Sequence, residues 1–434
     1  MEMHYPVFTE DMKKTHTILI PNMAPVQFRI LAAAMEHKGY KVELLGNCGS
    51  QVSELGLKYV HNDTCYPALL VIGQFLDALQ SGKYDLDHTA LIITQTGGGC
   101  RASNYIFLLR KALEKAGYGN IPVLSLNFSG LEKGNSLPMD LTFIRMALAA
   151  IYYGDLLVTL KAQTAPYEIH PGDAAALQEK WLDTICGWGH EGKGFSQQEM
   201  KATMPKIAAE FAAIPVHRVP KVKVGVVGEI YVKYSPLGNN DLENFLATQD
   251  CEVNLPGLMG FVQYCAYNPS ETARLYGGSF LEKHISDLIL GYIAQMEKVI
   301  IHALKDNGYH APLPFSELTE LTEGLISKGD KMGEGWLLTA EMAELIRSGY
   351  ENIICAQPFG CLPNHICGKG MINKLRELYP QANITPIDYD PSATRVNQEN
   401  RIKLMLAVAR ERLAEKAEAQ ESKTRAGEQE PVLV

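Results

Sequence analysis

Apolar residues occur along the chain in two alternating patterns, short β-branched runs and longer stretches with helical spacing. The N-terminal runs of strand length are HTILIPNM (16–23), KVELL (41–45), TALIITQ (89–95) and IPVLSLNF (121–128). Residues 27–40, residues 66–84 and the stretch after Cys100 have helical periodicity and separate these runs. This alternation of strand and helix, with Gly at the junctions, predicts a mostly parallel α/β sheet.

The second half of the chain repeats this alternation after a long helical region. The pattern is helical from about residue 137 to 215, and new strands are predicted at 221–232, 251–256, 350–358 and 382–391. We therefore expect an α/β protein with two Rossmann-like parallel-sheet domains joined by helical segments. Its expected parts are an N-terminal α/β domain (1–136), a helical connecting region (137–219), a C-terminal α/β domain with a helical insertion (220–420) and a disordered polar tail (421–434).

Composition narrows the class of protein. The chain has 434 residues, of which 46% are hydrophobic, so it can build sizeable cores. Its net charge of −9 disfavours a nucleic-acid partner. We find no signal peptide at the N-terminus and no continuous apolar run near the roughly 18 residues of a membrane span, so we expect a cytoplasmic protein without a membrane partner. Nine cysteines in such a chain favour thiols, metal sites or redox chemistry over structural disulfides.

One cysteine lies on a three-glycine turn. In TGGGCRASNY (96–105), Cys100 follows a predicted strand and precedes a predicted helix. Glycine leaves the backbone amides of such a turn free of side-chain bulk. Cys100 is therefore placed where a ligand could approach the backbone closely.

Two further cysteines are predicted to occupy the same kind of position. Cys65 stands two residues before Pro67, which suits the first turn of a helix, and Cys361 follows the strand predicted at 350–358. We expect all three thiols in loops beyond the carboxyl ends of strands, where open α/β sheets bind ligands. Helix N-termini at such loops stabilise thiolates and anionic ligands, and an iron–sulfur cluster held by thiolates is such a ligand.

Other interpretations of the cysteines remain open at this point. Zinc would use these thiols with His61 or His365, although the closest cysteine spacing is C-x5-C, at 355/361 and 361/367. A catalytic cysteine needs a base, and no neighbouring residue supplies one. Most isolated cysteines in α/β proteins are small buried hydrophobes; this is the interpretation for Cys48, Cys186 and Cys251, whereas Cys265 is evenly balanced.

These same motifs resemble a known family. The sequence is similar to 2-hydroxyacyl-CoA dehydratase components and their double-cubane-cluster relatives, in particular the cysteine-bearing region of large acyl-CoA dehydratase activase fusion proteins. The similar segments are 6–28, GLKYVHNDTCYPALLVIGQ (56–74), IITQTGGGCRASNY (92–105), VGEIYVKY (227–234), QPFGCLPNHICGKG (357–370) and 387–406. They are spread over nearly the whole chain.

The resemblance implies an oxygen-sensitive iron–sulfur cluster between the two Rossmann-like domains. The positions that match the family's cluster ligands are Cys65, Cys100 and Cys361, which would hold a simple [4Fe–4S] cluster. A double-cubane [8Fe–9S] cluster uses more thiolates, and Cys355 and Cys367 are the nearest additional candidates.

The resemblance also implies partners and a reaction. In the family a separate ATP-dependent activator reduces the cluster, with electrons from a ferredoxin or flavodoxin. This chain shows no P-loop and no G-x-G-x-x-G after a strand, so we expect it to bind no nucleotide. It would be the electron-accepting component of a low-potential reductase or a 2-hydroxyacyl-CoA dehydratase-like system, as a homodimer acting on an acyl-CoA or another small molecule.

Several polar residues near these cysteines are candidates for roles in the site. Glu229, at the end of the strand predicted at 221–232, is a candidate acid or base, or a buried hydrogen-bond acceptor. Candidates to position substrate or donate to cluster sulfurs are Asn62, Asp63, Arg101, Asn104, Asn364 and His365, and His365 is also a candidate catalytic residue. Asn and Asp also favour turns and helix starts for local reasons, and this applies to Asp388 and Asp390 as well.

Overall fold

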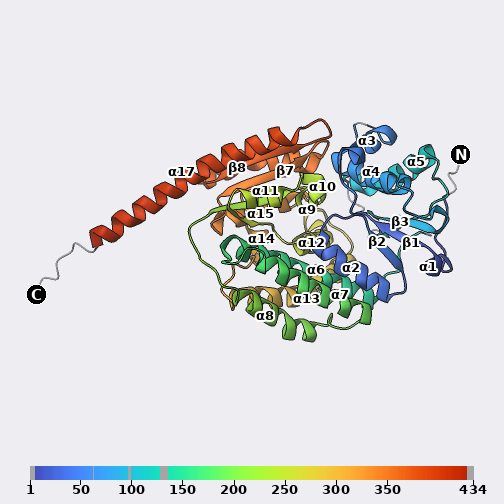
Figure 1. Ribbon diagram of the computed structural model, residues 1–434, viewed down its shortest axis with the longest axis horizontal. Helices are drawn as coiled ribbons and strands as arrows, with labels where there is room; N and C mark the ends of the chain where they lie inside the picture. Colours follow the sequence, from blue (N-terminus) through green and yellow to red (C-terminus); the bar gives the residue numbers. More distant parts are fainter. Residues whose placement is uncertain (1–4, 62, 96–98, 128–134, 428–434) are drawn as a thin grey trace, which may run out of the picture.

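The computed structural model describes residues 5–61, 63–95, 99–127 and 135–427, with side chains up to residue 419. Its described part contains two four-stranded sheets, each entirely parallel and flanked by helices (Figure 1). The expected α/β class with two Rossmann-like sheets is therefore confirmed. Short helical turns lie at Leu86–His88, Arg101–Asn104, Ala165–Tyr167, Asn364–Gly368 and Lys369–Met371.

The first sheet has the order β2-β1-β3-β4. Its strands are β1 (Thr17–Ile20), β2 (Lys41–Leu44), β3 (Thr89–Gln95) and β4 (Val123–Asn127). Its helices are α1 (Met12–Thr15), α2 (Pro25–His37), α3 (Ser50–Tyr59), α4 (Tyr66–Gln80) and α5 (Tyr105–Ala116). The nearly continuous apolar run of β3 is buried because helices cover both faces of a parallel sheet.

The second sheet has the equivalent order β6-β5-β7-β8. Its strands are β5 (Val222–Gly228), β6 (Cys251–Asn254), β7 (Asn352–Pro358) and β8 (Asn383–Tyr389). The strand predicted at 221–232 ends at Gly228, because Glu229 caps the short helix α9 (Ile230–Tyr234). The other helices of this part are α10 (Pro236–Asn239), α11 (Leu242–Thr248), α14 (Phe315–Glu320), α15 (Trp336–Arg347), α16 (Ile372–Leu378) and α17 (Arg395–Gly427).

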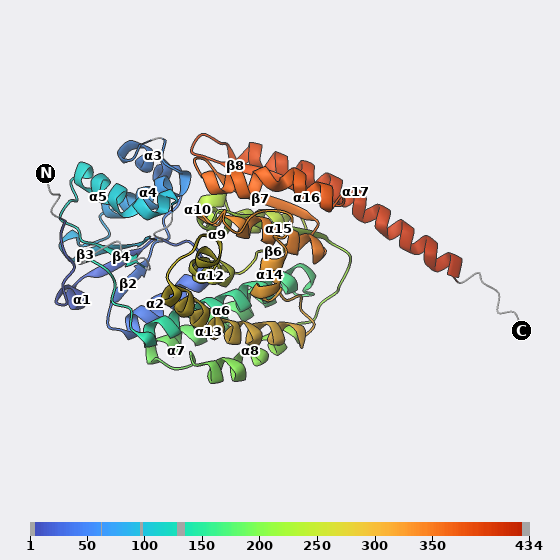
Figure 2. The same ribbon diagram turned by 180° about the vertical axis from the view of Figure 1, so that it is seen from behind.

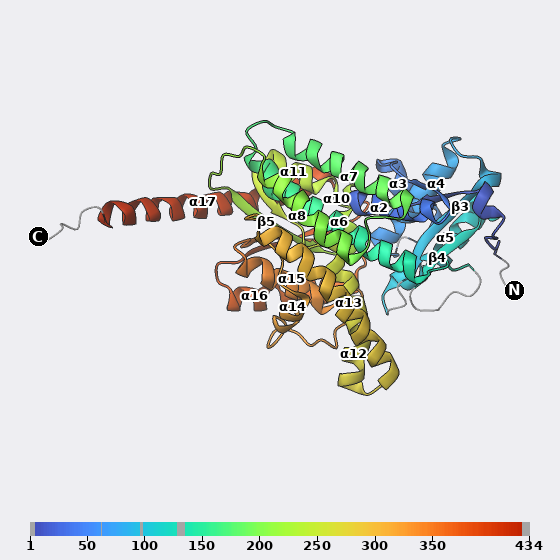
Figure 3. The same ribbon diagram turned by 90° about the horizontal axis from the view of Figure 1, so that it is seen from below.

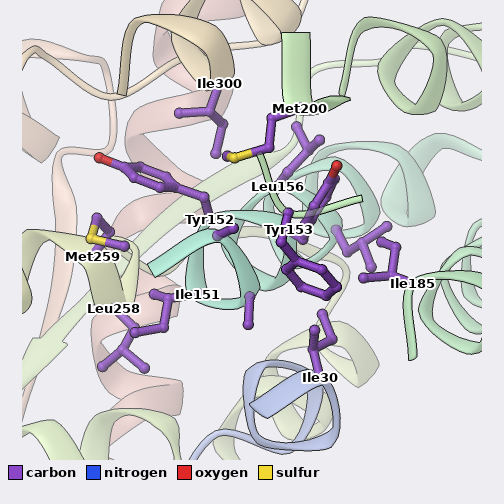
Figure 4. Packing of buried hydrophobic residues seen from close by; sticks show 14 of the residues in the cluster. Ile30, Ile151, Tyr152, Tyr153, Leu156, Ile185, Met200, Leu258, Met259 and Ile300 are labelled. Atoms are coloured by element: carbon purple, nitrogen blue, oxygen red, sulfur yellow. The ribbon is translucent and has the colours of Figure 1, made fainter. Parts of the chain in front are cut away.

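A helical layer adjoins both sheets. It contains α6 (Leu141–Thr164), α7 (Asp173–Glu191), α8 (Gln197–Ala212), α12 (Leu258–Tyr276) and α13 (Phe280–Lys305). Helix α6 lies at its centre, where buried side chains of α6 pack against residues of the surrounding helices (Figure 4). The labelled residues in that view are Ile30, Ile151, Tyr152, Tyr153, Leu156, Ile185, Met200, Leu258, Met259 and Ile300.

Helix α6 is also the one candidate membrane span in the described residues. The segment Leu141–Tyr167 is long and apolar enough by length and composition, and 61% of its most apolar window is buried inside the protein. Arg145, Asp155 and Lys161 interrupt it, which is why the sequence shows no continuous apolar run. A buried core helix has the same composition, so this feature is weak evidence for a membrane span.

The C-terminal helix is longer than the sequence pattern indicated. Helix α17 continues to Gly427, so residues 421–427 are helical and the predicted disordered tail at 421–434 is corrected to that extent. Residues 428–434 lie outside the described part. Figures 1 and 2 show that the last turns of α17 project away from the rest of the molecule.

The two sheet-containing parts contact each other through α4 and α10. One apolar cluster contains buried side chains of both parts, including Leu91 of β3 and Ile354 of β7. A backbone hydrogen bond of 3.0 Å, from Tyr66 N to Phe359 O, joins the start of α4 to the loop after β7. In each sheet the chain switches sides between its two central strands, and such switch points form ligand-binding crevices at the carboxyl ends of the strands.

Candidate functional site

Cys100 lies where the glycine turn joins strand to helix, as predicted. It precedes the helical turn Arg101–Asn104, which leads directly into α5, and its Sγ accepts a hydrogen bond of 3.3 Å from Ala102 N. Gly99 N donates to the Met332 thioether sulfur at 3.2 Å. The first part of the turn, residues 96–98, lies outside the described residues. The described part places the thiol beside the Ala102 amide, after the end of β3.

Cys65 caps the start of α4, with Pro67 in the first turn as predicted. The expectation that it follows a strand is wrong, because helix α3 stands between β2 and Cys65. Two glycines bring α3 against α4: a Cβ at Gly56 would lie 2.2 Å from Leu69 O, and one at Gly73 would lie 1.9 Å from Val52 O. This close packing of helices, and not a strand end, positions the buried Cys65 thiol.

Cys361 follows β7 in a loop that passes directly over Cys65. Gly360 has a φ of +75°, and a Cβ at this residue would lie 3.0 Å from Cys65 Cα. The hydrogen bond from Tyr66 N to Phe359 O fixes the same approach. The loop of the second domain is therefore in contact with the cysteine of the first.

A third segment, residues 330–335, contacts both the Cys361 loop and Cys100. A Cβ at Gly333, whose φ is +59°, would lie 3.0 Å from Pro363 Cγ and 3.8 Å from Cys100 Cβ. Burial is the main cause of the raised pKa of Cys100 and of Cys361; Cys65 adds to the first shift and Cys100 to the second, so the three thiols lie near one another. The structure thus brings together the three cysteines that the sequence singled out, from both domains. We refer to them as the thiol triad.

Burial and charge keep the triad protonated when no cation is bound. Burial raises the pKa of Cys65, raises that of Cys100 to about 12 and raises that of Cys361 well above its usual range. Glu229 adds to each of these shifts. A hydrogen bond with Tyr105 Oη at 2.9 Å from Cys65 Sγ partly offsets the effect of burial. As thiolates, these groups need a cationic partner.

Two buried carboxyl groups lie beside the triad, at the start of α9. Glu229 accepts a hydrogen bond of 2.9 Å from Val232 N, and Glu334 accepts one of 2.9 Å from Ile230 N. Burial, followed by the charge of Glu334, raises the pKa of Glu229 to about 8. Burial also raises the pKa of Glu334, and Lys233 partly offsets this. Two such groups in a dry site cannot both ionise readily, so the pair retains a proton at neutral pH.

His365 is engaged on both ring nitrogens. Its Nδ1 lies 2.6 Å from Cys361 O and its Nε2 lies 2.7 Å from Gln357 Nε2. With the ring proton on Nδ1, the imidazole donates to the Cys361 carbonyl and accepts from the Gln357 amide. Both contacts are within the loop that carries Cys361.

The two additional cysteine candidates stand apart from the triad. Cys355 is fully buried within β7, in the apolar cluster that β7 forms with α15 and α16, and its Sγ lies 3.6 Å from Asn364 Oδ1. Cys367 is also buried, and its carbonyl accepts a hydrogen bond of 2.6 Å from Thr339. Burial raises the pKa of both thiols to about 12. After burial and Asp330, the charge of Glu334 also contributes to the raised pKa of Cys367.

The remaining polar candidates are mostly structural. Arg101 donates to Asp63 O, which ties the segment before Cys65 to the segment after Cys100. Asn364 is buried and donates to Ala356 O at 3.2 Å, and Asp390 accepts from Ser392 N at 2.7 Å in a turn. His61 and Asn104 are exposed, and His61 contacts Asp63. Asp388 is half-buried and pairs with Lys369 and Arg401. Asn62 lies outside the described residues.

Sequence reasoning missed several residues of this site. Glu334 lies between glycines in KMGEGW, and no local pattern indicates that its carboxyl meets Glu229. Tyr105 is the first residue of α5, and nothing in the sequence distinguishes it from other helix residues. Only the tertiary fold brings Glu334 and Tyr105 to the triad. Cys265, which the sequence left evenly balanced, is open to solvent on α12.

The described residues do not form a centre for a single metal ion. Among the residues that the structure describes, no three His, Cys, Asp or Glu side chains are placed to hold one metal ion. Zinc needs four ligands around one point, with Zn–S distances of about 2.3 Å. A multi-iron cluster accepts each thiolate at a different iron, so its ligands stand further apart. The donor set of three thiols with nearby amides fits such a cluster.

Comparison with known proteins does not assign the chain. No protein-family model matches the sequence, and no curated protein matches it significantly.

Proposed function

We propose that this chain holds an iron–sulfur cluster and is the electron-accepting component of a low-potential reductase or a 2-hydroxyacyl-CoA dehydratase-like system. The observation that carries the proposal is the meeting of Cys65, Cys100 and Cys361, which come from three separate segments of two parallel-sheet domains. The loops that carry Cys100 and Cys361 follow β3 and β7, at the ends of the sheets where ligands bind.

The residues around the triad favour low-potential electron transfer. When bound, the cluster would accept and donate single electrons at a potential set by burial and by hydrogen bonds to its sulfurs. Tyr105 Oη and Ala102 N already contact the sulfurs of Cys65 and Cys100. His365 would position the loop of Cys361 through its hydrogen bond to the Cys361 carbonyl. Direct acid–base chemistry by His365 is less favoured, because both of its nitrogens are engaged.

Glu229 would be the proton donor of the reaction. Glu229 is buried beside the triad, and a negative charge on it would be repelled by Glu334. The pair therefore retains a proton at neutral pH. A proton held there could be delivered to a substrate oxygen or carbon that gains electron density on reduction. Lys233, which pairs with Glu341 at 3.0 Å, would limit the negative charge left behind.

The partners in this proposal follow from the resemblance. ATP would be hydrolysed by a separate activator, which receives electrons from a ferredoxin or flavodoxin and passes them to this chain in the cytoplasm. The substrate would be an acyl-CoA or another small molecule. The additional thiols Cys355 and Cys367 would be ligands only of a double-cubane cluster. They would reach it only if the loop between them shifted.

The ligand assignment is tested by two matched variants purified without oxygen. Cys100→Ala should lose most of its iron while its far-ultraviolet circular dichroism stays that of the wild type, because a cluster held by three thiolates cannot retain all its ligands. Cys186→Ala, on α7 away from the triad, should keep full iron. Full iron in the Cys100 variant, or equal loss in both, would remove the basis for the assignment.

A further inference from the structure

The helical hairpin of α12 and α13 carries an apolar surface without a partner in the described residues. Figure 3 shows the hairpin projecting away from the rest of the molecule. Its large apolar side chains are between 37% and 74% exposed: Leu275, Tyr276, Phe280, Leu281, Ile285, Leu288, Ile289 and Tyr292. We call these residues the hairpin surface. Apolar patches of this extent on soluble proteins mark interaction sites.

The spacing within α13 is that of a helix-pairing seam. Leu281, Ile285, Leu288 and Tyr292 follow one another at steps of four, three and four residues, which is the a/d repeat of coiled coils. From Ile293 onward the same helix is buried in the core around α6. The N-terminal half of α13 packs on α12 through a different face, where Ser286 donates a hydrogen bond to Ala266 O.

Charge allows the surface to approach a copy of itself. Between residues 275 and 292 the charged side chains are Glu282, Lys283 and Asp287, and the last two lie in an ion pair of 3.7 Å. This segment is nearly neutral in a chain of net charge −9, so two copies can meet here without the repulsion expected elsewhere. A heptad seam on one helix is also self-complementary under a two-fold axis.

We propose that the hairpin surface is the interface of a homodimer in which the exposed halves of two α13 helices pair antiparallel. A stable interface buries about 800 Å² on each partner, and eight large apolar side chains at this exposure can supply most of that area. The resemblance already implies a homodimer, and what this surface adds is the location of its interface. That location is independent of the iron–sulfur assignment, so each can fail without the other.

Sedimentation velocity of the full chain over a range of concentrations tests the interface. The wild type should be a dimer, and Leu288→Glu should raise the dimer dissociation constant by about a hundredfold or more, because dimerisation would bury an unpaired charge. The matched control is Leu404→Glu on α17, since Leu404 is 70% exposed and Leu288 is 74% exposed. The control should remain a dimer.

Two results would overturn this proposal. One is a monomeric wild type at every concentration, which would assign the hairpin surface to a different partner. The other is a Leu288→Glu variant that dimerises as tightly as the wild type, which would place the interface elsewhere. Amide exchange provides a check without mutation: residues 280–292 should exchange more slowly in concentrated than in dilute wild-type protein, and equal rates would contradict the interface.

Discussion

At the residue scale, the sulfurs of Cys65 and Cys100 contact neutral hydrogen-bonding groups, and the charge of Arg101 also acts on Cys65. The donors described are Tyr105 Oη for Cys65 and Ala102 N for Cys100. Burial raises the pKa of each thiol, so loading a cluster must displace protons. Neutral donors and backbone amides can stabilise bound sulfur and thereby tune the reduction potential.

Glu229→Gln tests the buried carboxyl pair through its effect on stability. The pKa of Glu229 is raised from 4.5 to about 8 in the folded protein. Between pH 4.5 and about 8 the folded state therefore binds one proton more than the unfolded state does. The wild-type free energy of unfolding should therefore fall as pH rises from about 4.5 to 8 and then level off. Glutamine cannot ionise and keeps an oxygen for Val232 N, so the variant should gain about 1–3 kcal/mol over the wild type near pH 8–9.

Thermal unfolding across this pH range measures the difference. The exposed Glu415→Gln on α17 is the control and should follow the wild-type curve. If Glu229→Gln showed the same pH dependence as the wild type, Glu229 would titrate normally and could not hold a proton at neutral pH.

At the element scale, the close approach of α3 and α4 determines where the Cys65 thiol lies. Gly56 and Gly73 face backbone carbonyls of the partner helix at distances that exclude any side chain. Cys65 caps α4, so a displacement of this helix moves the thiol relative to the loop of Cys361. The packing of these two helices is thus linked to the geometry of the triad.

Gly73→Ala tests this link. The new methyl group would lie 1.9 Å from Val52 O, so the helices must separate at a cost of about 1–3 kcal/mol, and iron content should fall with the displaced thiol. Gly187→Ala on α7 is the matched control, because a Cβ there meets nothing within 4 Å. It should be neutral or more stable by up to about 1 kcal/mol. Equal unfolding temperatures and iron contents in the two variants would contradict the proposed link.

Local patterns predicted the elements better than they predicted the site. The β-branched run at Thr89–Gln95 is a strand with the predicted bounds, because a buried parallel strand needs apolar residues on both faces. The sequence pattern did not predict helix α3. One of its buried positions is Gly56, and a glycine does not contribute to an apolar helical pattern. The placement of Glu334 beside Glu229 joins residues about a hundred positions apart and leaves no local pattern.

At the scale of the whole molecule, the triad lies where the two parallel-sheet domains meet. Cys65 and Cys100 come from the first domain and Cys361 from the second, and the hydrogen bond from Tyr66 N to Phe359 O crosses the same boundary. The helical layer around α6 lies beside both sheets and supports this arrangement. A cluster bound here would connect the domains covalently through its irons, so its loss would loosen their contact.

The most direct measurement is iron and acid-labile sulfide per chain, with a visible absorption spectrum, on wild-type protein purified without oxygen. We expect about four of each if Cys65, Cys100 and Cys361 hold one [4Fe–4S] cluster, or about eight irons and nine sulfides with a double-cubane cluster. Zinc in place of iron, or no metal at all in protein kept strictly anaerobic, would contradict the central claim and favour a zinc- or thiol-dependent structural or binding protein on the same fold.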